Sequence, residues 1–156
     1  TVAEALCATV IVGMAASAIL VSAASGSRVN NSGNELTRAV FLAQQIREWT
    51  LSLPFSDQDE GDQDNPPGPD GSDPQDYVDD LDDLMDATYS PPRDGQGSAI
   101  ADMSGWSQDI DITWRDPDDL TTVVADGASN VVHVEVTISC HGRQVMQSGW
   151  LVAESE

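Results

Sequence analysis

Two apolar patterns in the first 53 residues both favour a helix. Residues 5–25 form a run with no charged residue and no proline. At about 1.5 Å per residue a helix of that length crosses the roughly 30 Å hydrocarbon core of a bilayer. Residues 35–53 repeat apolar side chains every three or four positions, which is typical of an amphipathic helix. We therefore expect a helical stem over residues 1–53, in which residues 1–25 lie in a membrane or a filament core.

The second half of this stem predicts a buried stripe. Its centre is expected at Leu36, Val40, Ala43 and Ile46 or Arg47, since these positions recur at helical spacing. Further apolar side chains widen the stripe, namely Ala39, Leu42, Trp49 and Leu53. Asn34 suits an N-cap and Pro54 ends the helix. Such a stripe needs a partner surface, and a downstream sheet is the expected one.

Residues 26–34 interrupt the two helical patterns. The segment reads GSRVNNSGN, in which glycine and asparagine are poor helix formers. We expect a weak segment here, where the stem bends, frays or loses a turn.

From residue 106 the apolar period changes to two. Ile110, Ile112 and Trp114 fall on one face of the first predicted strand. In 130–140 the even positions are apolar and the odd positions mostly polar, and His141-Gly142 forms a turn into a strand over 143–153. Residues 106–156 thus predict an antiparallel β-meander with one buried face. The expected fold class is α+β, with the long stem helix packed on a small antiparallel sheet.

Between stem and sheet, residues 54–105 form an acidic loop region. Residues 56–76 are almost entirely polar, glycine or proline and cannot bury enough apolar area to fold alone. Residues 77–92 are consistent either with a short helix or with an irregular clamp in which Tyr77, Leu81 and Tyr89 attach the loop to the sheet.

The strong negative charge of the chain argues against binding to polyanions. The formal net charge is −21, with 27 acidic residues against six arginines and no lysine. A protein that binds nucleic acid directly, or docks electrostatically on anionic lipid, needs a basic face that six scattered arginines do not make. We expect neither activity from this chain.

Calcium is the one cofactor that the sequence suggests. Asp57, Asp59, Asp62 and Asp64 offer carboxylate oxygens at close spacing around Gly61, and Ca²⁺ prefers such ligands. No EF-hand pattern is present, because the glutamate expected at the twelfth position is missing. A solvated acidic loop without calcium is the alternative.

Enzymatic residues are not grouped in this sequence. His133 falls on the polar strand face and His141 in a turn, while Cys7 and Cys140 form neither a disulfide framework nor a CxxC pair. No nucleophile motif or glycine-rich phosphate loop is present. We expect a protein that is not an enzyme.

Glu4 is unusual beside so long an apolar run, since a carboxylate there is costly without a partner. The segment Thr1-Val2-Ala3-Glu4, followed by about 20 apolar residues, resembles the mature N-terminus of type IV pilins and type II secretion pseudopilins. The stretch LAQQIREW in the second half of the stem also resembles that family. Its members commonly carry the glutamate at the fifth place, after an N-methylated first residue. The resemblance therefore implies either that one residue precedes Thr1 in the mature protein or that the chain is processed unusually.

The resemblance implies a homo-oligomeric helical filament, built by packing the N-terminal helices. Glu4 would pair with the terminal amine of a neighbouring subunit near Thr1, and the small-residue face of Ala5, Thr9 and Gly13 would allow close helix approach. Prepilin peptidase and inner-membrane pilus assembly machinery are the implied partners. The chain would lie in the inner membrane before assembly and in a cell-surface filament afterwards. The alternatives are a secretion pseudopilin and a membrane-anchored acidic adhesion module that never polymerises.

Overall fold

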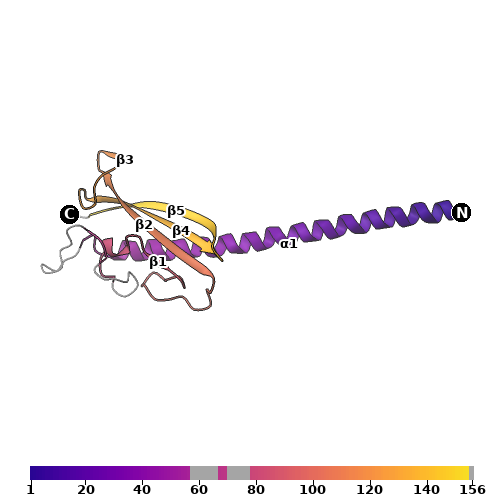
Figure 1. Cartoon of the computed structure of the whole chain (residues 1–156), viewed down its shortest axis with the longest axis horizontal. Coiled ribbons are helices and arrows are strands. Elements are labelled where there is room, and N and C mark those ends of the chain that lie inside the picture. The colour runs from indigo at the N-terminus through magenta and orange to yellow at the C-terminus, as the bar shows by residue number, and fades with distance from the viewer. Residues whose placement is uncertain (57–66, 70–77, 155–156) are drawn as a thin grey trace. The chain divides into compact units, whose positions relative to one another are not determined.

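The computed structural model describes residues 1–56, 67–69 and 78–154, except for the side chains of 4–8. Its elements are the helix α1 (Val2–Ser52), a 3-10 helix η1 (Asp82–Leu84) and five strands (Figure 1). The strands are β1 (Thr88–Tyr89), β2 (Trp106–Asp116), β3 (Asp119–Val123), β4 (Val131–Cys140) and β5 (Arg143–Ala153). The chain forms two compact units, here named the N-terminal unit (Thr1–Thr37) and the sheet unit (Arg38–Glu156). The α+β fold class is confirmed.

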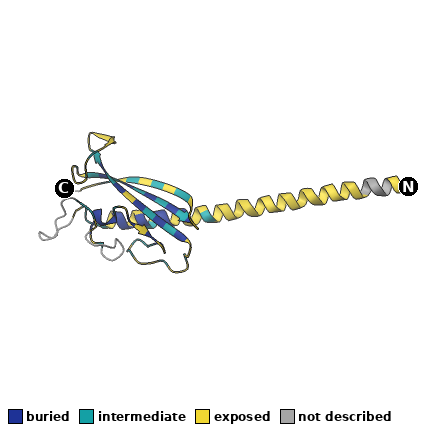
Figure 2. Ribbon diagram, viewed as in Figure 1, coloured by how far each residue is buried: buried dark blue, intermediate teal, exposed yellow. Residues whose placement is uncertain are grey.

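The N-terminal unit is helical throughout. Every described side chain from position 9 to 34 is exposed (Figure 2). The hydroxyl groups of Ser17 and Thr37 donate back to the carbonyls of Gly13 and Gly33 at 2.8 and 2.9 Å. The expected N-cap at Asn34 is wrong, because α1 continues through this residue; extending a helix costs far less than starting a new one.

In the sheet unit, one face of α1 packs on the sheet. The buried helix side chains are Ala39, Leu42, Ala43, Ile46, Trp49 and Thr50. The expected stripe is confirmed at Ala39, Leu42, Ala43, Ile46 and Trp49, and of the two alternatives Ile46 is buried and Arg47 exposed. It is wrong at Leu36 and Val40, which are 51% and 37% exposed because they lie at the margin of the arc that faces the sheet. Pro54 follows the end of α1 by two residues, as expected.

The sheet is antiparallel in every pairing. The strand order is β1-β2-β4-β5, and β3 pairs only with the end of β2. Residues Ile110 and Ile112 lie opposite Val136 and Val134, so the even positions of both strands form the buried face, as Figure 2 shows by their alternating colours. β2 thus pairs directly with β4, and β3 branches off as a hairpin arm held at Arg115↔Val123 and Asp116↔Asp119.

A buried glutamine connects the helix, the sheet and a loop. Gln108 lies on the apolar face of β2 and is fully buried. Its amide nitrogen donates to the carbonyls of Leu42 and Arg93, both at 3.1 Å, and its side-chain oxygen accepts from the Arg93 N–H at 2.6 Å. All the hydrogen-bonding groups that this side chain offers toward α1 and the loop are therefore used where water is excluded.

The segment from residue 78 to 105 covers one end of the helix. Leu81, Leu84 and Tyr89 are buried there, and the Tyr89 ring lies 5.6 Å from that of Trp49. Gly97 has φ +76°, and a Cβ at that position would lie 2.7 Å from the Trp49 ring. Only glycine suits this turn, since it needs both a left-handed conformation and a close approach to the indole.

We expect the weak segment 26–34 to be the region of α1 whose amides exchange fastest outside its first turn. It is exposed, and neither Gly26 nor Gly33 has any atom near its Cβ position. Hydrogen exchange of the detergent-solubilised chain should show lower protection for 26–34 than for 38–50. Gly26→Ala with Gly33→Ala should raise protection, because each alanine favours the helix by about 1 kcal/mol. Equal protection of both segments in the wild-type chain would contradict the weak-segment hypothesis.

Gln108→Leu should lower the free energy of unfolding of the sheet unit by about 2 kcal/mol, because it removes a buried hydrogen bond to the Leu42 carbonyl and leaves the part-buried Arg93 N–H and carbonyl without their partner. Gln147→Leu is the matched control, since Gln147 bonds Glu135 on the exposed face and should change stability by about 0.5 kcal/mol or less. Chemical denaturation followed by circular dichroism measures both. Equal stability losses in the two variants would show that Gln108 does not connect the layers.

Candidate functional site

The most prominent candidate site is the apolar surface of the N-terminal unit. Its exposed large side chains are Val2, Val10, Ile11, Val12, Met14, Ile19, Leu20, Val21 and Val29. The helical stretch Thr9–Ser52 contains an 18-residue window with a mean hydropathy of 1.8, none of it buried. By length and composition this helix could be a membrane anchor or a signal sequence.

The predicted assembly residues all fall on or before the first turns of α1. Thr1 precedes the helix and is exposed, and Thr9 and Gly13 are exposed four positions apart, hence on one helix face. The position of the Gly13 Cβ has no neighbouring atom within 4 Å, so this face is open to close approach. The side chains of Glu4 and Ala5 lie outside the described residues, and their roles stay predictions.

A second candidate is a carboxylate cluster beside η1. Asp79, Asp80 and Asp83 each place an oxygen within 4.8 Å of the others, and Asp80 and Asp83 are nearly fully buried. Asp80 accepts hydrogen bonds from the backbone N–H groups of Asp82 and Asp83 at 3.1 and 3.3 Å. Asp83 in turn accepts from the Asp79 N–H at 3.0 Å. These three carboxylates could bind a metal ion, for which hard oxygen ligands suit Ca²⁺ or Mg²⁺.

Burial raises the pKa of Asp80 above its usual value, and the negative charge of Asp83 adds to this effect. Hydrogen bonds with the Asp82 side chain and with the backbone of Asp82 and Asp83 oppose it. A raised pKa means that the folded state binds the proton more tightly than the unfolded state. The resulting stabilisation is complete below the unfolded-state pKa and is lost as pH rises through the folded-state value.

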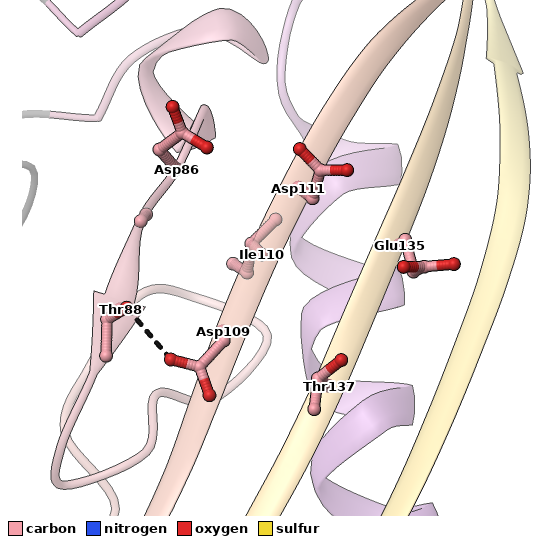
Figure 3. Close-up of a pocket in the computed structure, with 8 residues that line it drawn as sticks. Asp86, Thr88, Asp109, Ile110, Asp111, Glu135 and Thr137 are labelled. Carbon is pink, nitrogen blue, oxygen red and sulfur yellow. Dashed lines mark hydrogen bonds between the residues drawn. The ribbon is translucent and has the colours of Figure 1, made fainter.

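The outer face of the sheet carries an acidic cavity of about 270 Å³ (Figure 3). It is lined by Asp86, Ala87, Thr88, Asp109, Ile110, Asp111, Glu135 and Thr137. The Thr88 hydroxyl donates to Asp109 at 2.9 Å. No basic side chain is among the lining residues, so the cavity disfavours anionic ligands.

The calcium ligands expected from the sequence, Asp57, Asp59, Asp62 and Asp64, lie outside the described residues. The cluster of Asp79, Asp80 and Asp83 was not predicted. In the sequence this cluster is visible only as two acidic pairs, one directly before and one directly after Leu81. The structure is needed to show that Asp80 and Asp83 are buried.

The described histidine and cysteine side chains do not form a metal-binding group. His133 is half-buried, with its ring over Gly149, and His141 is exposed in the turn between β4 and β5. Cys140 is a buried free thiol. Among the described residues, no group of three histidine, cysteine or acidic ligands other than Asp79, Asp80 and Asp83 could hold a metal ion.

No protein-family model, curated protein or solved structure that was compared with this chain matches it. The coarse architecture, a long N-terminal helix with an antiparallel sheet, is compatible with that of a pilin.

Asp80→Asn should stabilise the protein at neutral pH in the presence of EDTA. The amide keeps an oxygen that can accept from the backbone of Asp82 and Asp83 but removes the buried negative charge. Its advantage over the wild type should shrink as pH falls, since the wild-type carboxyl then binds its proton. Thermal melting across pH measures this, with the exposed Asp126→Asn as the control.

Added divalent cations should favour the wild type over Asp80→Asn, the reverse of the order of stability expected in EDTA. If the cluster holds an ion, added Ca²⁺ or Mg²⁺ should raise the melting temperature of the wild type more than that of Asp80→Asn. An equal response of the two proteins would exclude a cation site at Asp80, and a lower stability of Asp80→Asn in EDTA would contradict the raised pKa.

Proposed function

We propose that this chain is a structural subunit of a type IV pilus-like extracellular filament, polymerised through its N-terminal hydrophobic helix. The observation that carries the proposal is the exposed apolar surface of residues 9–29, which belongs to a different compact unit from the sheet. A surface of this kind requires a bilayer or other copies of the same helix around it.

Burial supplies the driving force for assembly. Seven large apolar side chains between Val10 and Val21 are more than half exposed, and burying one such side chain contributes about 1.5–3 kcal/mol. In a membrane the lipid covers this surface. In a filament core neighbouring helices would cover it, and the small residues Thr9 and Gly13 would let them approach closely.

Glu4 would fix the axial register of the subunits. In the filament its carboxylate would pair with the terminal amine of a neighbouring copy, and in an apolar core a charge pair of this kind forms only where both partners meet. A monomeric membrane anchor gains nothing from a carboxylate beside its apolar segment. Glu4 therefore distinguishes the filament from a membrane-anchored adhesion module.

The apolar N-terminal helix also suggests how the subunit would reach the filament. The subunit would lie in the inner membrane until prepilin peptidase and the pilus assembly machinery act on it, and would then enter a cell-surface filament. A type II secretion pseudopilin is the alternative within this class. The acidic sheet unit would face outward, since 20 of the 27 acidic residues lie from Asp57 to Asp119 and repel one another unless solvated.

Glu4→Val should leave the amount of subunit in the membrane unchanged and strongly reduce filament yield, because the apolar helix remains while the charge pair is lost. Glu4→Gln should behave similarly with nearly the same side-chain shape. Glu4→Asp keeps the charge and is the matched control, with an intermediate yield expected. Immunoblots of membranes and of sheared filaments measure the two quantities.

Wild-type filament yield from Glu4→Val would contradict the proposed register contact. If neither the wild type nor any of these variants forms a filament, although each is present in the membrane, the adhesion module would be favoured.

A further inference from the structure

The outer edge of β5 is an open strand edge. β5 ends the strand order, and no strand among the described residues pairs with its other side. Such an edge invites pairing with another chain unless lysine, acidic residues, proline or a short length protects it. Over its 11 residues β5 has no lysine, acidic residue or proline. Its two protective features, Arg143 at the first position and a register irregularity between Gln144 and Met146, lie at its N-terminal end, so residues 147–153 are unprotected. Residues 136–153 contain no acidic residue in a chain that carries 27.

An apolar helix stripe flanks this edge. The Trp150 indole N–H donates to the Thr50 hydroxyl at 3.2 Å, which shows which side of α1 lies beside β5. At 100° per residue, Val40, Arg47 and Leu51 lie about 60–100° further around the helix from Thr50, away from Trp49. All three are exposed, Leu51 to 55%. On β5, Met146, Trp150 and Val152 are half-buried and pack against the core.

The β3 arm has the complementary properties. All five of its residues are exposed, including Leu120 at 46% and Val123 at 57%. Asp119 orders the arm, since its carboxylate accepts from the hydroxyl groups of Thr121 and Thr122 at 2.7 and 2.9 Å. β3 thus has two exposed apolar side chains among its five residues, and its own sheet pairs it with β2 only through its first and last residues, Asp119 and Val123.

Charge matches the arm to the edge. Asp116 and Asp119 pair in the arm and Asp118 lies in its turn, with Arg115 as the single opposing charge, so the arm is negative. The positive side chains beside β5 are Arg143 and Arg47 of α1, whereas Glu135 accepts a hydrogen bond from Gln147 and Glu154 follows the last residue of β5. Elsewhere the acidic surfaces of two copies repel each other, which leaves this contact as the favourable approach.

We propose that the β3 arm of one copy adds as a strand to the β5 edge of a second copy. Strand addition would satisfy the open backbone groups of the edge and cover Val40 and Leu51 with an apolar side chain of the arm. Because arm and edge are different patches, the contact is heterologous, and each added copy presents a new arm and a new edge. This interface lies wholly in the sheet unit and is separate from the contact proposed for Glu4.

Cysteine cross-linking of the full chain tests this contact. In a Cys7→Ala, Cys140→Val background, one protein carries Thr121→Cys in the arm and a differently tagged one carries Gln147→Cys or Ser148→Cys in the edge. Mixed in mild detergent under gentle oxidation, arm and edge should form mixed dimers, since a disulfide requires the two Cβ atoms about 3.5–4.5 Å apart. The control pairs the edge cysteine with Ala101→Cys, which is exposed in a loop; its yield should be several-fold lower.

Additional substitutions in the cross-linking proteins test whether the disulfide forms through the proposed contact. Adding Val123→Asp to the arm protein should abolish the mixed dimer, whereas Ala101→Asp, which adds the same charge elsewhere, should not. Glu4→Gln should leave cross-linking unchanged, so a failure of the proposed filament register would remain distinguishable from a failure of this contact. Edge-to-edge dimers of the Gln147→Cys protein alone would show symmetric β5 pairing and overturn the proposal. A mixed yield no higher than the Ala101→Cys control would also overturn it.

Discussion

Burial of one face of α1 on the even-numbered residues of β2 and β4 is the interaction on which the sheet unit depends. Ala39, Leu42 and Ile46 are fully buried against side chains such as Val134 and Ile138. The sheet is small, and without the helix its apolar inner face would be exposed to water, which would cost the free energy that burial of these side chains contributes. Gln108 adds direction to this apolar contact, since its hydrogen bonds form only at one position of the helix along β2.

Periodicity was sufficient to predict the layers but not their details. The alternation around Ile112 and Val136 located two strands and their buried faces, because a period of two leaves one choice of face. Helical periodicity located the helix and most of its buried arc but included Leu36 and Val40, since apolar side chains surround much of the helix and only the sheet selects among them. The role of Gln108 could not be predicted, because a polar residue on an apolar face is informative only when its partners from distant segments are known.

Negative charge is concentrated in one part of the chain and absent from two others. Carboxylates are concentrated from Asp57 to Asp119, where repulsion favours solvent and cations such as those that the cluster at Asp80 could hold. Positions 5–34 and 136–153 contain no carboxylate at all. These two stretches are also where the N-terminal helix and the β5 edge offer apolar or uncharged surface. Both contacts proposed above use these stretches, since like charges at a close interface oppose association.

The location of the aromatic residues makes the sheet unit optically distinct. All four tryptophans, Trp49, Trp106, Trp114 and Trp150, belong to it, and three of them are buried. Intrinsic indole fluorescence thus originates entirely from the sheet unit, and the N-terminal unit is silent. Emission from intact chains in detergent, in vesicles or in an assembled state would follow the packing around Trp49 and Trp114 without any added label, whatever surrounds the apolar helix.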